Sequence, residues 1–270
     1  MTKLCTTVLA VVLGAALAIP GLQAQPKPKS QKEIQALQAI QNAATPDDRL
    51  KAIDSLLENF ADTEFKVMVL QMAMQTAEQK GDYPLTVTYG ERLLEADPKN
   101  IFALSTLASE IAGHTREFDL DKEEKLAKAE KYANQAIADA KDAPKFRPDI
   151  TDEQWNGVKK DITAQSYDAL GRIAMLRKKY DAAITNFQTS ITEAASPDST
   201  TMVRLGEAYL QAGKYDDAIA SFDKAMAVPN APAAVKQVAS GRKAEALKLK
   251  ASGAKPAAPP AGPPPVEIKK

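Results

Sequence analysis

The sequence predicts an all-α fold in which helical hairpins stack side by side along the chain. The main observation is an internal repeat between residues 164 and 230, in which five residues recur 35 positions later. The recurring residues are Leu170, Gly171, Tyr180, Ala183 and Phe187 in the first copy and Leu205, Gly206, Tyr215, Ala218 and Phe222 in the second. Self-similarity at a period of roughly 20 to 50 residues is typical of stacked-repeat proteins. A composition with 26% charged and 6% aromatic residues agrees with a helical solenoid.

The spacing of small and large residues gives this repeat a physical reason. Gly171 and Ala174 lie on one side of a helix, so a second helix can approach it closely. Ala183 and Phe187 lie on one side of the next helix, where the aromatic ring can fill the space between two hairpins. Gly213 stands in the turn of the second copy and can end a helix with a positive φ. Since one hairpin cannot bury its apolar face alone, we expect the copies to stack.

The two copies resemble the tetratricopeptide repeat (TPR) family, whose signature is an aromatic residue, then a Leu-Gly pair, a Tyr, an Ala, a Phe, a second Ala and a late Pro. The matching residues are Leu205, Gly206, Tyr209, Ala218, Phe222 and Ala225 in the second copy and Tyr167, Leu170, Gly171, Ala183 and Phe187 in the first. Met202, Ala174 and Ser190 depart from the signature. The resemblance implies a right-handed superhelical solenoid of TPR-like helical hairpins with flanking helices. It also implies a concave groove, lined by the first helix of each hairpin, that binds extended peptides or partner helices.

The first helices are predicted from their N-terminal caps. Residues 25–30 form a flexible leader, after which Ser30 and Glu33 match a capping box for a helix that ends near residue 43. Thr45 then caps a second helix, with Pro46 in its first turn. The apolar stripe of this second helix consists of Leu50, Ile53, Leu56, Leu57 and Phe60. These helices are expected to open a TPR-like solenoid over residues 31–250.

Four hairpin repeats are expected within the solenoid. They lie near residues 67–100, 101–140, 164–198 and 199–232. The repeat near 67–100 is degenerate, because Met74 replaces the Gly of the pattern and Gly90 replaces the Phe. Two inserts interrupt the repeats, at residues 114–124 and 142–154, and their role is not indicated by their composition.

The last part of the chain contains one long helix, the two clear repeats and a terminal helix. Thr151 and Gln154 match a capping box for a helix that should run unbroken to Arg177, with Trp155 folding back on the preceding repeat. One more helix after Pro232 should cover the open end of the stack. Residues 251–270 form a disordered tail rich in Pro and Ala.

The N-terminus has the features of a secretory signal peptide over residues 1–24. Lys3 precedes an apolar run that Pro20 ends, and the small residue Ala24 precedes the expected cleavage point. We therefore expect an exported protein, periplasmic in the first instance, with a secreted or envelope-associated protein as alternatives. An uncleaved N-terminal anchor remains a further alternative.

Cleavage would leave a mature chain without cysteine and close to neutral. Cys5 is the single cysteine of the sequence, so the mature chain would have no disulfide in an oxidising compartment. The whole chain has a formal net charge of zero, and loss of Lys3 would make it about −1. A nearly neutral protein lacks the basic surface that nucleic acid requires. No segment after the signal could span a membrane, and the oligomeric state is not indicated.

The sequence shows no set of residues that would form a catalytic, metal or cofactor site. His114 is the single histidine and has no Cys nearby, whereas a metal site needs several ligands at fixed spacing. The sequence contains no G-x-S-x-G nucleophile motif and no glycine-rich phosphate loop. We therefore expect a protein that is not an enzyme and that has no cofactor.

The expected function is that of an exported scaffold that binds a protein or a peptide through the concave groove. By resemblance, the groove-facing candidates are Gln165, Asp168, Arg172, Met175, Thr200, Val203, Glu207 and Gln211. Arg172 is the best candidate for holding an acidic group, and a solvated arginine is the alternative. The sequence leaves two other functions open: an enzyme-associated module that uses the inserts, and a structural envelope spacer anchored by the Pro-rich tail.

Overall fold

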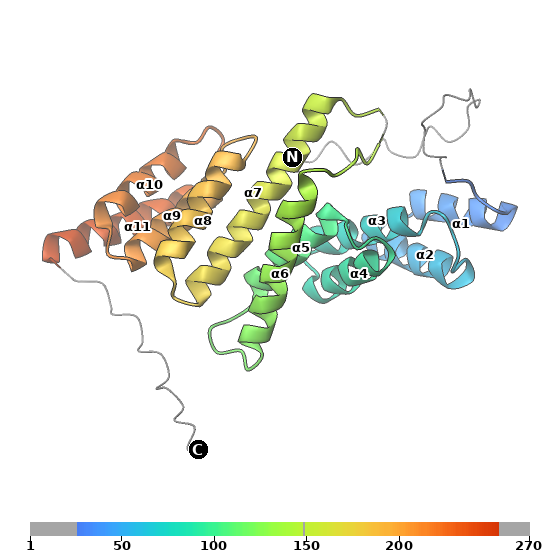
Figure 1. Cartoon of the computed structure of the whole chain (residues 1–270), viewed down its shortest axis with the longest axis horizontal. Helices are drawn as coiled ribbons and strands as arrows, with labels where there is room; N and C mark the ends of the chain where they lie inside the picture. Colours follow the sequence, from blue (N-terminus) through green and yellow to red (C-terminus); the bar gives the residue numbers. More distant parts are fainter. Residues whose placement is uncertain (1–25, 148, 254–270) are drawn as a thin grey trace, which may run out of the picture. The chain divides into compact units, whose positions relative to one another are not determined.

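The protein is all-α, as predicted. The computed structural model describes residues 26–147 and 149–253, and it contains eleven α-helices and no strand within those ranges (Figure 1). The predicted signal peptide, residues 1–24, and most of the predicted tail, residues 254–270, lie outside the described residues. The chain divides into two compact units, Met1–Pro98 and Lys99–Lys270. Each unit is a stack of antiparallel helical hairpins.

The first unit contains two hairpins. Their helices are α1 (Gln31–Gln41), α2 (Pro46–Asn59), α3 (Lys66–Gln79) and α4 (Tyr83–Ala96). The side chains of Ser30, Thr45 and Asp82 each accept a hydrogen bond from a backbone N–H in the first turn of α1, α2 and α4. These caps satisfy donors that the helix itself leaves unpaired. The degenerate repeat corresponds to α3 and α4, in which Met74 and Gly90 are both buried.

The segment predicted as a flexible leader is attached to the first unit by hydrogen bonds. The backbone N–H of Lys27 donates to Glu64, and the ammonium of Lys29 donates to Asp62 at 2.7 Å. The Glu33 carboxylate, which is fully buried, accepts from the Lys29 N–H and from the Thr63 hydroxyl, both at 2.5 Å. Ser30 therefore caps α1 as predicted, but the Glu33 carboxylate bonds one residue earlier than a capping box requires.

The second unit contains three hairpins and a final helix. Its helices are α5 (Ile101–His114), α6 (Lys122–Ala140), α7 (Asp152–Leu176), α8 (Tyr180–Glu193), α9 (Ser199–Gln211), α10 (Tyr215–Ala227) and α11 (Ala233–Ser252). Helices α7 to α11 lie side by side in chain order (Figure 1). Helix α11 packs against α9 and α10 through Ala239 and Ala246, which are fully buried.

The two predicted inserts are shorter in the structure. Helix α5 continues through His114 and α6 begins at Lys122, so the first connection spans only residues 115–121. The expectation that His114 lies in a loop is therefore wrong, because the α5 hydrogen-bonding pattern extends to it. The second connection spans residues 141–151.

The start of α7 packs on the connection before it, as predicted. Thr151 and Gln154 form a capping box. Trp155 is buried and its indole N–H donates to the carbonyl oxygen of Ala143 at 2.9 Å. Its ring also lies 5.5 Å from that of Phe146 and 6.3 Å from that of Phe102 on α5. This aromatic cluster fixes the longest helix of the chain against the hairpin α5–α6.

Three hairpins share one turn geometry between their helices. The second residue after the end of the first helix has a positive φ in each: 69° at Gly81, 59° at Lys178 and 72° at Gly213. The next residue donates its N–H to a carbonyl five positions back, as in Asp82 to Ala77 and Lys214 to Tyr209. This is the pattern of a Schellman motif, which ends a helix with its carbonyls satisfied.

No helix in the described part of the chain is both long and apolar enough to cross a membrane.

Candidate functional site

The predicted groove residues lie on α7 and α9, and each set forms one stripe along its helix. Residues 165, 168, 172 and 175 follow helical spacing on α7, and residues 200, 203, 207 and 211 follow it on α9. We call the side of α5, α7, α9 and α11 that carries these stripes and their direct partners the first-helix face. Polar contacts connect each of these helices to the next along this face.

Asp168 joins α7 to α9. Its side chain is 8% exposed. Both carboxylate oxygens accept hydrogen bonds from Arg204 Nη1 at 2.9 Å, and Oδ1 also accepts one from the Thr201 hydroxyl at 3.1 Å. The guanidinium of Arg172, one turn further along α7, forms an ion pair with the same carboxylate at 3.3 Å. This carboxylate therefore has two cationic partners and little contact with solvent.

Arg172 joins α7 to α5. Its Nη2 donates to the carbonyl oxygen of Ser109 at 2.6 Å and to the Ser109 hydroxyl at 2.7 Å. A Cβ placed on Gly113 would lie 2.7 Å from Arg172 Nη1, so a larger residue at this position would require the guanidinium to shift. Burial lowers the pKa of Arg172, and the nearby Asp168 carboxylate opposes that shift. Arg172 thus holds α7 against α5 within the fold, and the solvated arginine considered as an alternative is not observed.

The same kind of contact recurs one repeat later. Glu207 on α9 forms an ion pair with Arg242 on α11, in which Nε donates to Oε1 and Nη2 donates to Oε2. Arg172, Glu207 and Arg242 are spaced 35 positions apart, so the charge at one repeat position alternates in sign along the stack. Sequence reasoning missed Arg242, although its place two repeat lengths after Arg172 was a signal that could have found it.

A second series of ion pairs connects the ends of successive hairpins. Asp181, in the first turn of α8, pairs with Lys214, the residue before α10, and the Asp216 carboxylate of α10 pairs with Lys250 of α11. Both acids are more than three-quarters exposed. Exposed pairs of this kind contribute little to stability, so the buried contacts of Asp168 and Arg172 matter more.

The remaining predicted residues differ in how accessible they are. Gln165 accepts a hydrogen bond from the Ser105 hydroxyl of α5 at 2.9 Å. Val203 is buried in the core between α9, α10 and α11. Met175 and Thr200 are half-buried, and Gln211 is exposed. Gln211 is the exposed member of the eight predicted residues and leaves the most surface for a partner.

The described residues contain no group of three or more His, Cys, Asp or Glu side chains arranged to hold a metal ion. The ring Nδ1 of His114 lies 3.0 Å from the carbonyl oxygen of Glu110 and 3.4 Å from its carboxylate, at the end of α5. This contact is local to one helix turn.

Comparison with protein families gives one match. Residues 162–230, which cover the end of α7 and all of α8, α9 and α10, match the family model described as tetratricopeptide repeat. A comparison with curated proteins finds no match.

Solved structures with a similar arrangement of helices include three named here. The thermophilic TPR protein TTC0263 of Thermus thermophilus is 19% identical, with 81% of this chain and 96% of that chain covered and a TM-score of 0.46. The type IV pilus biogenesis factor PilW is 11% identical, with 83% and 91% covered and a TM-score of 0.49. MamA is 18% identical, with 72% and 99% covered and a TM-score of 0.40.

TPR regions typically serve as scaffolds for contacts between proteins, and the repeat positions of this chain agree with the family signature over two consecutive hairpins. The glycine, alanine and phenylalanine positions of that signature are all buried at the helix contacts of α7 to α10. The chain thus contains tetratricopeptide repeats at residues 162–230.

Proposed function

We propose that this protein is an exported, non-catalytic scaffold that binds a protein or an extended peptide through the first-helix face. The observation that carries the proposal is the match of residues 162–230 to the tetratricopeptide repeat. Solenoid repeats expose one extended surface built from equivalent helices, and such surfaces serve for binding. The partner is a protein segment, since the face combines half-buried apolar and polar groups in a row.

The contacts along the face support this role because they fix the side chains before any partner arrives. Asp168, Arg172 and Glu207 are held by intramolecular partners. A partner that binds there does not have to immobilise these long side chains, and the entropy cost of binding is lower for that reason. Arg204, whose side chain is 34% exposed, and Gln211 keep donors at the surface for such a partner.

Photocrosslinking tests this binding mode. A benzophenone amino acid at Gln211 or Thr200 should crosslink to a discrete partner protein in an envelope extract. The same amino acid at Ala220, which is exposed on the second helix of the same hairpin, is the matched control and should give no such product. Equal crosslinking from all three positions, or from none, would contradict binding through the first-helix face.

The proposed export depends on residues 1–24, which lie outside the described residues. The mass of the protein purified from its native host should correspond to a chain that begins at Gln25. A mass that includes residues 1–24, together with recovery from the membrane pellet, would instead indicate an uncleaved anchor.

A further inference from the structure

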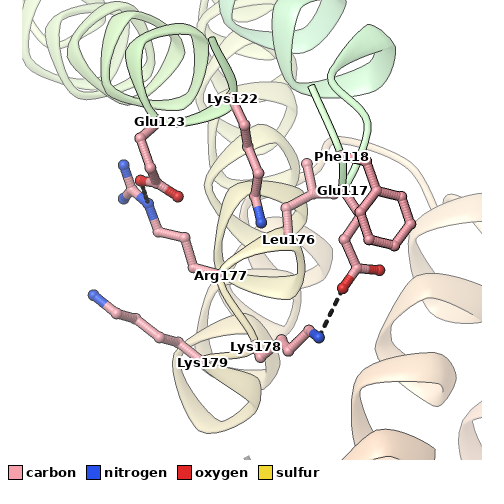
Figure 2. A pocket seen from close by; sticks show the side chains of 8 residues that line it. All are labelled: Glu117, Phe118, Lys122, Glu123, Leu176, Arg177, Lys178 and Lys179. Carbon is pink, nitrogen blue, oxygen red and sulfur yellow. Dashed lines mark hydrogen bonds and ion pairs between the residues drawn. The ribbon is translucent and has the colours of Figure 1, made fainter. Parts of the chain in front are cut away.

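The second unit has a pocket on the side where the α5–α6 connection approaches the α7–α8 turn. Figure 2 shows the eight side chains that line it. They come from the connection and the start of α6, and from the end of α7 and its turn: Glu117, Phe118, Lys122, Glu123, Leu176, Arg177, Lys178 and Lys179. None of these residues belongs to the predicted groove or to the first-helix face.

The charges of the pocket are unequal, because its cations outnumber its acids. Lys178 pairs with Glu117 at 2.7 Å, and the Nε of Arg177 pairs with Glu123 at 3.0 Å (Figure 2). Arg177 also pairs with Glu130 of α6, which lies outside the pocket. The ammonium groups of Lys122 and Lys179 form no direct ion pair in the described ranges, although Lys122 also attracts the Glu117 carboxylate at longer range. Two cations at the pocket are therefore left to attract an anionic group.

An aromatic ring stands beside these cations and is almost fully exposed. The Phe118 side chain is 89% exposed, and Leu120, two residues later, is completely exposed. A large apolar side chain in water loses the free energy that burial would supply. Neither residue contributes to the core, so the fold gives no reason for an apolar side chain at these positions.

The connection that presents Phe118 is held in one conformation by its own hydrogen bonds. The Arg116 N–H donates to the Asp119 carboxylate at 3.0 Å, and the Asp119 N–H donates back to the Arg116 carbonyl oxygen at 3.3 Å. Lys125 of α6 pairs with Asp119 at 3.1 Å and with Asp121 at 2.9 Å. Asp119 and Asp121 thus share Lys125 as their partner, and Phe118 lies on a turn that these hydrogen bonds close.

We propose that this pocket is a second docking site, which binds a partner segment that carries carboxylates next to a large apolar side chain. The apolar side chain contacts Phe118 and Leu176, and the carboxylates contact Lys122 and Lys179. Pairing of an apolar anchor with flanking charges is typical of binding surfaces. An anionic bilayer is a poorer occupant, because residues 116–125 carry five acids and only three bases.

A synthetic peptide tests the proposal. The probe is a fluorescein-labelled peptide with a central Leu-Phe pair flanked by aspartates on both sides, titrated with the full chain and followed by fluorescence anisotropy. We expect saturable binding that weakens by about tenfold when Lys122→Gln and Lys179→Gln are combined. Phe118→Ser should weaken binding at least about tenfold, because the anchor is lost. A peptide with asparagine in place of every aspartate should bind like the double lysine variant.

Matched controls come from exposed residues of α11. Lys236→Gln and Leu247→Ser remove the same kinds of side chain far along the sequence and should leave peptide binding unchanged. Gln211→Ala should also leave it unchanged, which separates this site from the first-helix face. The proposal is overturned if the peptide does not bind, if the asparagine peptide binds equally well, or if Phe118→Ser affects only binding to phosphatidylglycerol vesicles.

Discussion

The ring of Phe187 occupies the space where a side chain on Gly171 would lie. A Cβ placed on Gly171 would be 2.4 Å from Phe187 Cε1, and one placed on Gly206 would be 2.5 Å from Phe222 Cε1. In both hairpins the phenylalanine follows the glycine by 16 positions. Both rings are among the largest fully buried side chains. The repeat signature therefore specifies side-chain size: a phenylalanine ring on the second helix packs against a glycine, which has no side chain, on the first.

This contact predicts opposite effects for alanine at two helical glycines. Gly206→Ala should destabilise the protein by about 1–3 kcal/mol, because the Phe222 ring has no free space into which it can move. Gly241→Ala is the control: it lies within α11, where a Cβ would meet nothing within 4 Å. There the better helix propensity of alanine should stabilise by about 0.5–1 kcal/mol. Urea unfolding of the two variants measures both values, and a stabilising effect at Gly206 would refute the size argument.

The features that were predicted from the sequence are those that depend on local spacing. The small residues at the helix contacts, the cap at Thr151 and the turn at Gly213 could be predicted because each depends on spacing within one hairpin or one helix turn. The contact of the Phe187 ring with Gly171 of its own hairpin was not predicted, since the ring was expected between two hairpins. The partner of Arg172 could not be predicted, because Ser109 lies 63 positions earlier and nothing in the pattern around either residue indicates the other. Contacts between hairpins depend on how the helices stack. Helical periodicity predicts which side of a helix faces a neighbour, but it does not predict which residue of the neighbour lies there.

The degenerate repeat has the large and the small residue of this contact exchanged, and we therefore expect two substitutions there to compensate each other. Met74 and Gly90 are also 16 positions apart, and both are buried, so they occupy the registers of the glycine and the phenylalanine with large and small exchanged. Met74→Gly alone should cost about 2–5 kcal/mol because it leaves a cavity. Adding Gly90→Phe should recover at least half of that loss in a double-mutant cycle. Additive losses in calorimetry would show that the two positions do not share one space.

Lys178 is not a glycine, although it stands at a turn position where the backbone has a positive φ. It has φ 59°, whereas glycine stands at the equivalent positions 81 and 213. Lys178→Ala and Lys178→Gly both remove the ion pair with Glu117, so their comparison isolates the backbone. We expect the glycine variant to melt about 2–4 °C above the alanine variant, because only glycine adopts a positive φ without strain. Equal melting temperatures would mean that the turn relaxes in the alanine variant.

Asp168 and Asp181 both pair with the next repeat, but they should contribute differently to the free energy of unfolding because they differ in burial. Asp168→Ala should cost about 2–3 kcal/mol, since it leaves the guanidinium groups of Arg172 and Arg204 without their shared carboxylate in a poorly solvated place. Asp181→Ala removes a carboxylate that is 87% exposed and should cause no measurable change. Chemical denaturation of the two variants provides the comparison, and similar losses would contradict the assigned difference.

The pKa of the Glu117 carboxylate should show whether its ion pair with Lys178, at the edge of the pocket, forms in solution. Its hydrogen bond with Lys178 lowers the pKa of Glu117 below the ordinary 4.5. A group whose pKa is lower in the folded state stabilises the fold above its unfolded pKa, and this contribution is lost as the pH falls through the folded value. Lys178→Met should therefore raise the pKa of Glu117 toward 4.5, as measured by carbon-detected NMR of the side-chain carboxyl. An unchanged Glu117 titration would mean that the ion pair drawn at the edge of the pocket does not persist in solution.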